Sequence, residues 1–259
     1  MKFLPGTVSG FWILVIISAF IAASIHRARR GTLPKFRTIP GLEAIPEAIG
    51  RAAETGRPVL FNPGIADLTG DYASQTYAGL EILSHVSRLC ARYDVSIIVP
   101  IRQASVLPVA EDIVRLGYAT ENKLDQLRPD AVRFISPFQF GYVSGVLGIT
   151  ERERIAANFI MGATWSETPS YLEAGNGVGA IQIGGTANLH QLQFFVAGCD
   201  YTLIGEELFA GGAYVSEDKA KLGSIAGQDI GKIIAVVLTF AGVVYAAFGS
   251  KWLTNLLSK

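Results

Sequence analysis

The sequence predicts an α/β fold: an open, mostly parallel sheet of about six strands between two layers of helices, with an apolar helix at each end of the chain. Along the middle of the 259-residue chain, short β-branched runs alternate with longer segments of helical periodicity, which is typical of βαβ units. Apolar runs of membrane-spanning length occupy 8–25 and 230–249. Residues 41–229 between them are predicted to form one α/β domain.

The composition indicates a folded middle rather than a disordered linker. Hydrophobic residues make up 50% of the chain and charged residues 17%, and the formal net charge is zero. Disordered segments combine low hydrophobicity with high net charge, and nucleic-acid-binding domains carry a basic surface. We therefore expect a globular domain with no nucleic-acid partner.

The first apolar run, 8–25, is predicted to be a transmembrane helix. It contains no charged residue and approaches the roughly 20 residues that span a bilayer core. A cleaved signal sequence is the alternative, since the small residues 22–24 lie near its end. A basic linker, predicted at 26–40, favours retention as an anchor and places this flank in the cytoplasm. Its basic residues are His26, Arg27, Arg29, Arg30, Lys35 and Arg37.

The second apolar run, 230–249, is also predicted to cross the bilayer, with a short tail at 250–259. Lys251 and Trp252 follow it and suit a membrane interface, although a buried core helix is the alternative. Two spans place both termini outside and residues 41–229 in the cytoplasm. The expected location is the cell (inner) membrane, with the lipid bilayer as a partner.

The first elements of the predicted domain follow from local spacing. Apolar residues recur at helical spacing over 42–52, and Pro46 lies in the first turn, where proline is tolerated. Gly56-Arg57-Pro58 then interrupts the pattern, and a β-branched and aromatic run at 59–61 predicts the first strand. The helical period therefore gives way to a strand at residue 59.

The later elements repeat this alternation. Further helices are predicted at 80–93, 109–118, 138–150, 166–175 and 189–196, and after Glu206. Further strands are predicted at 95–99, 132–135, 155–161, 180–183 and 201–204. Parallel strands need right-handed helical crossovers and are covered on both faces, so these units predict a three-layer αβα, Rossmann-like sheet. They are too few for a closed barrel.

Glycine-bearing turns follow several predicted strands and are the predicted ligand-binding site. In an open parallel sheet, ligands bind beyond the carboxyl ends of the strands, where helices present free N–H groups. Turn chemistry alone is the alternative, because glycine adopts positive φ and Thr or Asn caps the next helix. The candidate residues are Gly64, Gly162, Thr164, Gly185, Thr186, Asn188 and Gly205.

No cofactor can be named from these turns. A GxGxxG fingerprint is missing after every predicted strand, and Asp71 stands where a phosphate loop would carry lysine. Cys90 and Cys199 lack CxxC spacing, and no HExxH pattern occurs, so no metal site is predicted.

Adjacent carboxylates at Glu206 and Glu207 are the catalytic candidates. At the end of a strand, with Asn188 and His190 in the neighbouring turn, they would serve as acid/base groups. The alternative is structural, since acidic side chains stabilise the positive end of a helix dipole. No nucleophilic motif accompanies them, so whether the protein is an enzyme stays open.

Two segments carry a resemblance to a known family. Residues 173–188 and 199–207, together with Gly64 and 227–229, resemble an uncharacterised family of prokaryotic membrane-anchored proteins built on a domain of unknown function. The resemblance covers roughly residues 40 to 232. It implies a prokaryotic membrane protein and no particular activity.

Three functions follow from these observations. The first is a membrane-anchored, homo-oligomeric scaffold or assembly protein, in which small residues at 235, 239, 242 and 246 let helices of neighbouring copies approach closely. The second is a small-molecule sensor that uses the glycine turns. The third is a membrane-tethered enzyme that uses Glu206 and Glu207.

Overall fold

The computed structural model describes residues 8–30, 38–216 and 219–247. The chain forms two compact units: a helical hairpin from its two ends, and an α/β domain over residues 37–216. The predicted tail, 250–259, and residues 31–37 of the predicted basic linker lie outside the described residues.

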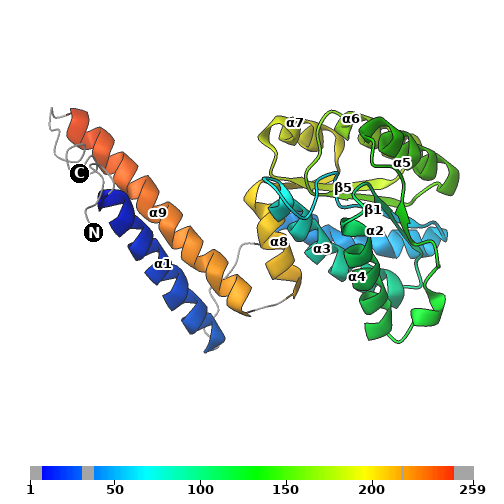
Figure 1. The fold of residues 1–259 in the computed structure, drawn as a ribbon, viewed down its shortest axis with the longest axis horizontal. Coiled ribbons are helices and arrows are strands. Elements are labelled where there is room, and N and C mark those ends of the chain that lie inside the picture. Colours follow the sequence, from blue (N-terminus) through cyan, green and yellow to red (C-terminus); the bar gives the residue numbers. More distant parts are fainter. Residues whose placement is uncertain (1–7, 31–37, 217–218, 248–259) are drawn as a thin grey trace. The chain divides into compact units, whose positions relative to one another are not determined.

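The elements of the α/β domain alternate along the chain (Figure 1). Its strands are β1 (Val59–Asn62), β2 (Ile97–Ile101), β3 (Val132–Phe134), β4 (Ala157–Met161), β5 (Ile181–Thr186) and β6 (Tyr201–Ile204). Its helices are α2 (Pro40–Thr55), α3 (Ala73–Arg92), α4 (Val106–Thr120), the 3₁₀ turn η1 (Leu124–Gln126), α5 (Gln139–Glu153), α6 (Thr168–Gly177), α7 (Leu189–Gly198) and α8 (Glu206–Ser216).

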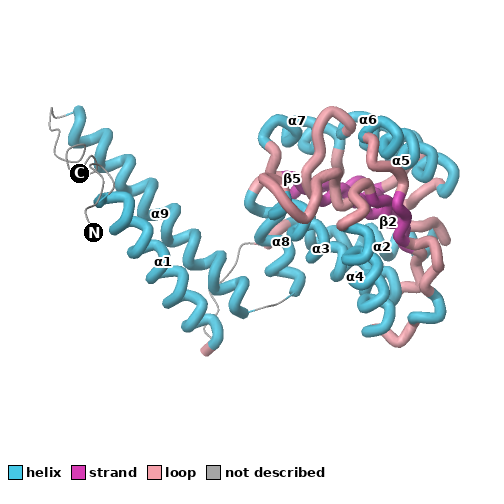
Figure 2. The backbone as a smooth tube through the Cα atoms, viewed as in Figure 1, coloured by secondary structure: helices cyan, strands magenta, loops and turns pink. Residues whose placement is uncertain are grey.

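All six strands form one parallel sheet in the order β3-β2-β1-β4-β5-β6. Helices α2, α3, α4 and α8 cover one face and α5, α6 and α7 the other, as Figure 2 shows. The predicted open, three-layer, Rossmann-like sheet is confirmed. Because the chain leaves β1 in one direction and returns at β4 to continue in the other, the order reverses between these two strands.

Each face of the sheet has its own apolar core. In β1, Val59 and Phe61 face the α2–α3–α4–α8 layer, and Leu60 faces the α5–α6–α7 layer. The rings of Phe61 and Phe159 stack with centroids 6.2 Å apart. Burial on both faces explains why these strands are continuous apolar runs without alternation.

Strand β5 extends further than the sequence predicted, because Gly184 and Gly185 belong to it. A Cβ at Gly184 would lie 2.2 Å from Cδ1 of Phe195, and one at Gly185 would lie 3.1 Å from Sδ of Met161. These glycines let side chains from α7 and β4 pack directly on the strand, so Gly185 is a packing residue and not part of a turn.

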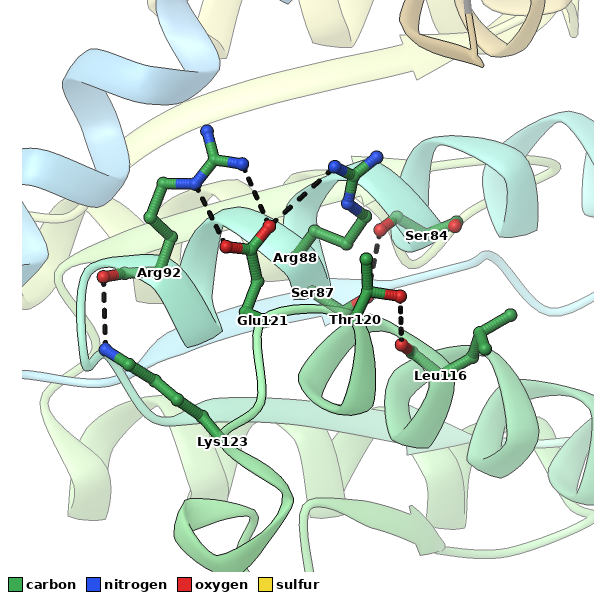
Figure 3. A network of polar contacts seen from close by, with 8 residues as sticks. All are labelled: Ser84, Ser87, Arg88, Arg92, Leu116, Thr120, Glu121 and Lys123. Carbon is green, nitrogen blue, oxygen red and sulfur yellow. Dashed lines mark hydrogen bonds and ion pairs between the residues drawn. The ribbon is translucent and has the colours of Figure 1, made fainter.

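Charged side chains tie together the C-terminal ends of α3 and α4 (Figure 3). The Glu121 carboxylate accepts hydrogen bonds from Nε and Nη2 of Arg92, at 3.3 and 2.9 Å, and lies 3.7 Å from Nη2 of Arg88. Lys123 Nζ donates to the Arg92 carbonyl at 3.3 Å. The Arg92 hydrogen bonds are the main reason that the pKa of Glu121 lies below its ordinary value.

The two end helices, α1 (Val8–Arg29) and α9 (Lys219–Ala247), pack against each other in antiparallel orientation. Gly223, Gly227 and Gly231 of α9 face Ile25, Ile21 and Ile17 of α1, respectively. Both helices are long and apolar enough to cross a bilayer, by length and composition. Close helix contact therefore uses Gly223 and Gly227, whereas Gly231 leaves room for a Cβ.

Helix α9 begins eleven residues before the predicted start at Ile230. Residues 219–229, which the sequence analysis assigned to the α/β domain, are helical and group with the hairpin. Glycine is unfavourable inside a helix. The first turns of α9 are therefore stabilised by the contact that Gly223 and Gly227 make with α1.

Candidate functional site

A pocket of about 780 Å³ lies at the carboxyl-terminal edge of the sheet, on the face covered by α5, α6 and α7. It opens beside the reversal of strand order between β1 and β4, where open α/β sheets bind ligands. Its lining residues are Ile65, Arg102, Gln139, Trp165, Ser166, Pro169, Gln191 and Phe194.

The parallel topology brings these residues together from distant parts of the sequence. Ile65, Arg102 and Trp165 follow the ends of β1, β2 and β4, and Gln139, Pro169 and Gln191 lie in the first turns of α5, α6 and α7. Because every strand ends at the same edge and each following helix begins there, one face of that edge collects side chains from five connections.

Asn62, at the end of β1, organises the buried base of this region. Its Oδ1 accepts hydrogen bonds from Gly64 N at 2.9 Å and from the Tyr142 hydroxyl at 3.0 Å. The Pro100 carbonyl oxygen also lies 3.0 Å from this hydroxyl and shares its single proton with Asn62 Oδ1. Burial raises the pKa of Tyr142 well above its usual value. The phenol therefore stays protonated and joins β1, β2 and α5.

Glu167 is a buried carboxylate, 3% exposed, just before α6. Its Oε1 accepts a hydrogen bond from Trp165 N at 2.9 Å, and its Oε2 accepts one from Gln139 Nε2 at 2.7 Å. The Trp165 ring meets the Tyr72 ring edge-on, with centroids 4.9 Å apart. These contacts fix one wall of the pocket and place a negative charge at the N-terminus of α6.

Two polar side chains of the pocket have atoms without a hydrogen-bond partner among the described residues. Arg102 donates from Nη1 to the Ile65 carbonyl at 2.8 Å, but its buried Nε has no partner in these ranges. Gln191 is 8% exposed, and its buried Oε1 likewise accepts no hydrogen bond from this part of the chain.

Gly64 and Gly162, two of the predicted ligand-binding residues, bring the β1 and β4 loops into contact. A Cβ at Gly64 would lie 2.5 Å from the Ala163 carbonyl oxygen, and one at Gly162 would lie 2.3 Å from the Pro63 carbonyl oxygen. Ile65 N donates to Ala163 O at 2.9 Å. The glycines thus allow the β1 and β4 loops to pack together, and they are not among the residues that line the pocket.

Thr164, Thr186 and Asn188 form a buried link between the loops after β4 and β5. Asn188 donates from Nδ2 to Thr164 O at 3.0 Å and from its backbone N to Thr186 Oγ1 at 3.2 Å. Its Oδ1 caps α7 by accepting from His190 N at 3.3 Å. These residues position Trp165 and α7 but do not line the pocket.

Gly205, Glu206 and Glu207 lie after β6 and also do not line the pocket. Gly205 has φ of +58°, and its N donates to Thr186 O at 3.0 Å. Oε2 of Glu207 accepts a hydrogen bond from Ile204 N at 3.0 Å. The structure therefore gives Glu207 a contact that ties the first turn of α8 to the last residue of β6.

No group of three or more His, Cys, Asp or Glu side chains within the described residues is arranged to hold a metal ion. Burial raises the pKa of the Cys90 thiol and raises that of Cys199 to about 12. Both thiols are therefore protonated and unreactive near neutral pH.

The sequence model of a family described as a domain of unknown function (DUF6754) matches residues 3–257. The chain belongs to this family. No curated protein and no solved structure matches the chain.

The match extends beyond the range of residues 40 to 232 over which the sequence showed the resemblance. It takes in α1 and α9 as well as the α/β domain, so the terminal helices belong to the same family unit as the sheet. Membership in a family of unknown function is thereby confirmed, whereas membrane anchoring and prokaryotic origin stay predictions.

Proposed function

We propose that this chain is a membrane-anchored protein of a prokaryotic cell whose cytoplasmic α/β domain binds a small molecule. The pocket beside β1 and β4 carries the proposal, because it combines a defined volume with buried polar atoms that lack partners in the described chain. Buried polar groups are ordinarily hydrogen-bonded, so a ligand that forms hydrogen bonds with these atoms gains binding free energy.

Exposed apolar side chains support the membrane anchor. In the hairpin, Trp12, Leu14, Val236 and Phe240 are 58%, 63%, 68% and 71% exposed. Contiguous apolar surface of this kind is unfavourable in water and favourable in the hydrocarbon core of a bilayer.

The antiparallel hairpin also supports the direction of insertion. It brings Arg27 and Arg29, at the end of α1, to the same end as Lys219 and Lys221, at the start of α9. Basic residues beside a span favour the cytoplasm. The α/β domain then lies in the cytoplasm and both termini lie outside the inner membrane.

Cysteine labelling in intact cells tests this topology. In a background with Cys90 and Cys199 replaced by Ala, Ser258→Cys is expected to react with a membrane-impermeant maleimide in intact cells. Ser166→Cys is expected to react only after lysis. Labelling of Ser166→Cys in intact cells would contradict the cytoplasmic placement of the domain.

A blocked pocket tests the binding function. Ser166 is exposed and lines the pocket, so Ser166→Trp fills it without disturbing a buried contact. Full-length protein in nanodiscs is screened against a fragment library by saturation-transfer NMR. The proposal expects hits with wild type that disappear in Ser166→Trp and persist in Glu47→Trp, a change on exposed α2 surface. Hits that survive Ser166→Trp would refute it.

A homo-oligomeric scaffold is the second candidate, favoured by the edge of the sheet at β6. Val196, Ile204 and Phe209, on the consecutive elements α7, β6 and α8, are 60%, 48% and 40% exposed. An edge strand flanked by apolar side chains favours self-association. Mass photometry in nanodiscs is expected to show an oligomer that Ile204→Asp reduces to monomer. A wild-type monomer would exclude this candidate.

A further inference from the structure

The pocket carries a cationic side chain without a carboxylate partner. Arg102 makes no ion pair within the described ranges, and it donates a hydrogen bond to the neutral Ile65 carbonyl. Its Nε is buried and unpaired within the same ranges. A guanidinium binds a carboxylate through two parallel N–H donors, so an anionic oxygen group in the pocket would satisfy Nε and the charge together.

The acidic residues near Arg102 are engaged elsewhere. Glu167 is held by Trp165 N and Gln139 Nε2. Asp67 accepts hydrogen bonds from the Ser105 hydroxyl and from Leu68 N, which lower its pKa. Neither carboxylate competes for the guanidinium through a hydrogen bond in the structure.

Gln191 adds a second requirement on the ligand. This side chain is more than nine-tenths buried, it lines the pocket, and its Oε1 has no donor within the described chain. An amide oxygen accepts hydrogen bonds only. A ligand therefore satisfies Gln191 with an N–H or O–H group.

The remaining wall is apolar and partly aromatic. Ile65, Pro169, Trp165 and Phe194 line it, and contact with Tyr72 holds the Trp165 ring in place. Such a surface suits the face of a ring.

The helix termini distinguish a carboxylate from a phosphate. Phosphate sites use free N–H groups at a helix N-terminus. Here the Glu167 carboxylate belongs to the residue just before α6, where it accepts from Trp165 N and not from the helix, and the Asn188 side chain caps α7. A second negative charge at α6 would be repelled by Glu167, which favours a singly charged group bound through Arg102.

Resting on the proposed binding function, we infer that the pocket takes a small aromatic carboxylic acid that also carries a hydroxyl or N–H donor. The carboxylate pairs with Arg102, the donor bonds Gln191 Oε1, and the ring lies against Trp165 and Phe194.

Matched probes test this ligand class on full-length protein in nanodiscs. The acid is 4-hydroxyphenylacetate, its neutral counterpart is 4-hydroxyphenylacetamide, and phenyl phosphate is the doubly charged control; binding is measured by saturation-transfer NMR titration. Wild type is expected to bind the acid about tenfold more tightly than the amide, as one charge-assisted hydrogen bond predicts. Phenyl phosphate is expected to bind more weakly than the acid.

Variants of the two polar residues complete the test. Arg102→Gln is expected to remove the preference for the acid, and Arg102→Lys, which keeps the charge, to retain part of it. Gln191→Leu is expected to weaken acid and amide equally. Thermal melting of each variant shows that it is folded.

The remaining outcomes separate this inference from the binding function itself. If the amide or phenyl phosphate binds wild type as tightly as the acid, and Ser166→Trp abolishes that binding, the ligand class is wrong and the pocket still binds small molecules. If no probe binds but library hits disappear in Ser166→Trp, the ligand class alone is wrong. If Ser166→Trp changes no binding, both proposals fail.

Discussion

Gly227 of α9 lies against the backbone of Ile21 in α1, so closely that a Cβ at Gly227 would come within 2.6 Å of the Ile21 Cα. Gly231, one turn later, faces Ile17 with a clearance of 3.8 Å for the same added atom. The hairpin is therefore tight at one glycine and open at the next.

This difference predicts unequal effects of one substitution at two positions. Gly227→Ala should force the helices apart and destabilise the hairpin by about 1–3 kcal/mol, the usual range for overpacking. Gly231→Ala should be neutral or slightly stabilising, because alanine favours a helix. Unfolding in mixed micelles measures both. Equal losses would show that the two glycines serve helix flexibility instead of contact with α1.

The contact between the β1 and β4 loops predicts a second pair of unequal effects. Gly64 and Gly70 have similar backbone conformations, with φ of +84° and +90°, but a Cβ at Gly64 would overlap Ala163 whereas one at Gly70 would meet open space. Gly70→Ala should cost about 1 kcal/mol from the conformation alone. Gly64→Ala should cost about 3 kcal/mol, because overlap adds to that strain. Thermal melts that show equal losses would contradict the close approach.

Local signals explain why the elements could be predicted from the sequence. The change from helical to β-branched spacing after Gly56 marks β1, and the same change locates the other five strands within a few residues. Strand order was not predicted, because pairing β1 with β4 depends on a contact between Val59 and Ala157, far apart in the chain. The start of α9 was missed because its first turns are polar and are stabilised by α1.

The turns predicted to bind a ligand lie at the same edge of the sheet as the pocket, but none of the predicted residues lines it. Gly64 and Gly162 were predicted to bind a ligand, with positive-φ turn chemistry as the alternative; both have positive φ, and each lies against the neighbouring loop, a contact that no single sequence reveals. Trp165 and Gln191 lie within three residues of the predicted Thr164 and Asn188 and were within reach of the same reasoning. Arg102 and Gln139 follow strands without a glycine turn, so the turn signal missed them.

The Glu121 cluster predicts a dependence of stability on pH. The pKa of Glu121 is lowered from its ordinary 4.5, chiefly by hydrogen bonds from Arg92. A group with a depressed folded-state pKa stabilises the protein above its unfolded pKa, and this contribution is lost as pH falls through the folded value. Glu121→Gln should therefore lower the melting temperature at about pH 7, and this effect should shrink as the pH falls below 4.5 through the depressed pKa of Glu121.

A matched variant on the same helix controls for charge alone. Glu111 lies on the exposed surface of α4, and Glu111→Gln should change the melting temperature equally little throughout this range of pH. If Glu121→Gln and Glu111→Gln behave alike across the range, the Arg92 contact contributes nothing to stability in solution.

Arg57 lies at the opposite, amino-terminal edge of the sheet, and its contacts predict that it stabilises the fold. Its guanidinium donates to the Arg154 carbonyl and, from Nη2, to the carbonyls of Ile155 and Val178, each at 2.7 Å, so one side chain joins the turns before β4 and β5 to the start of β1. Arg57→Ala leaves three carbonyls without this donor and should cost about 2–4 kcal/mol. Arg57→Lys should recover only part of the loss, since one ammonium cannot reproduce the planar fork.

Arg51→Ala, on exposed α2 surface, should stay within about 0.5 kcal/mol of wild type in its free energy of unfolding. Chemical unfolding of the full-length protein measures all three, and full rescue by lysine would show that charge at position 57, and not its geometry, stabilises this edge.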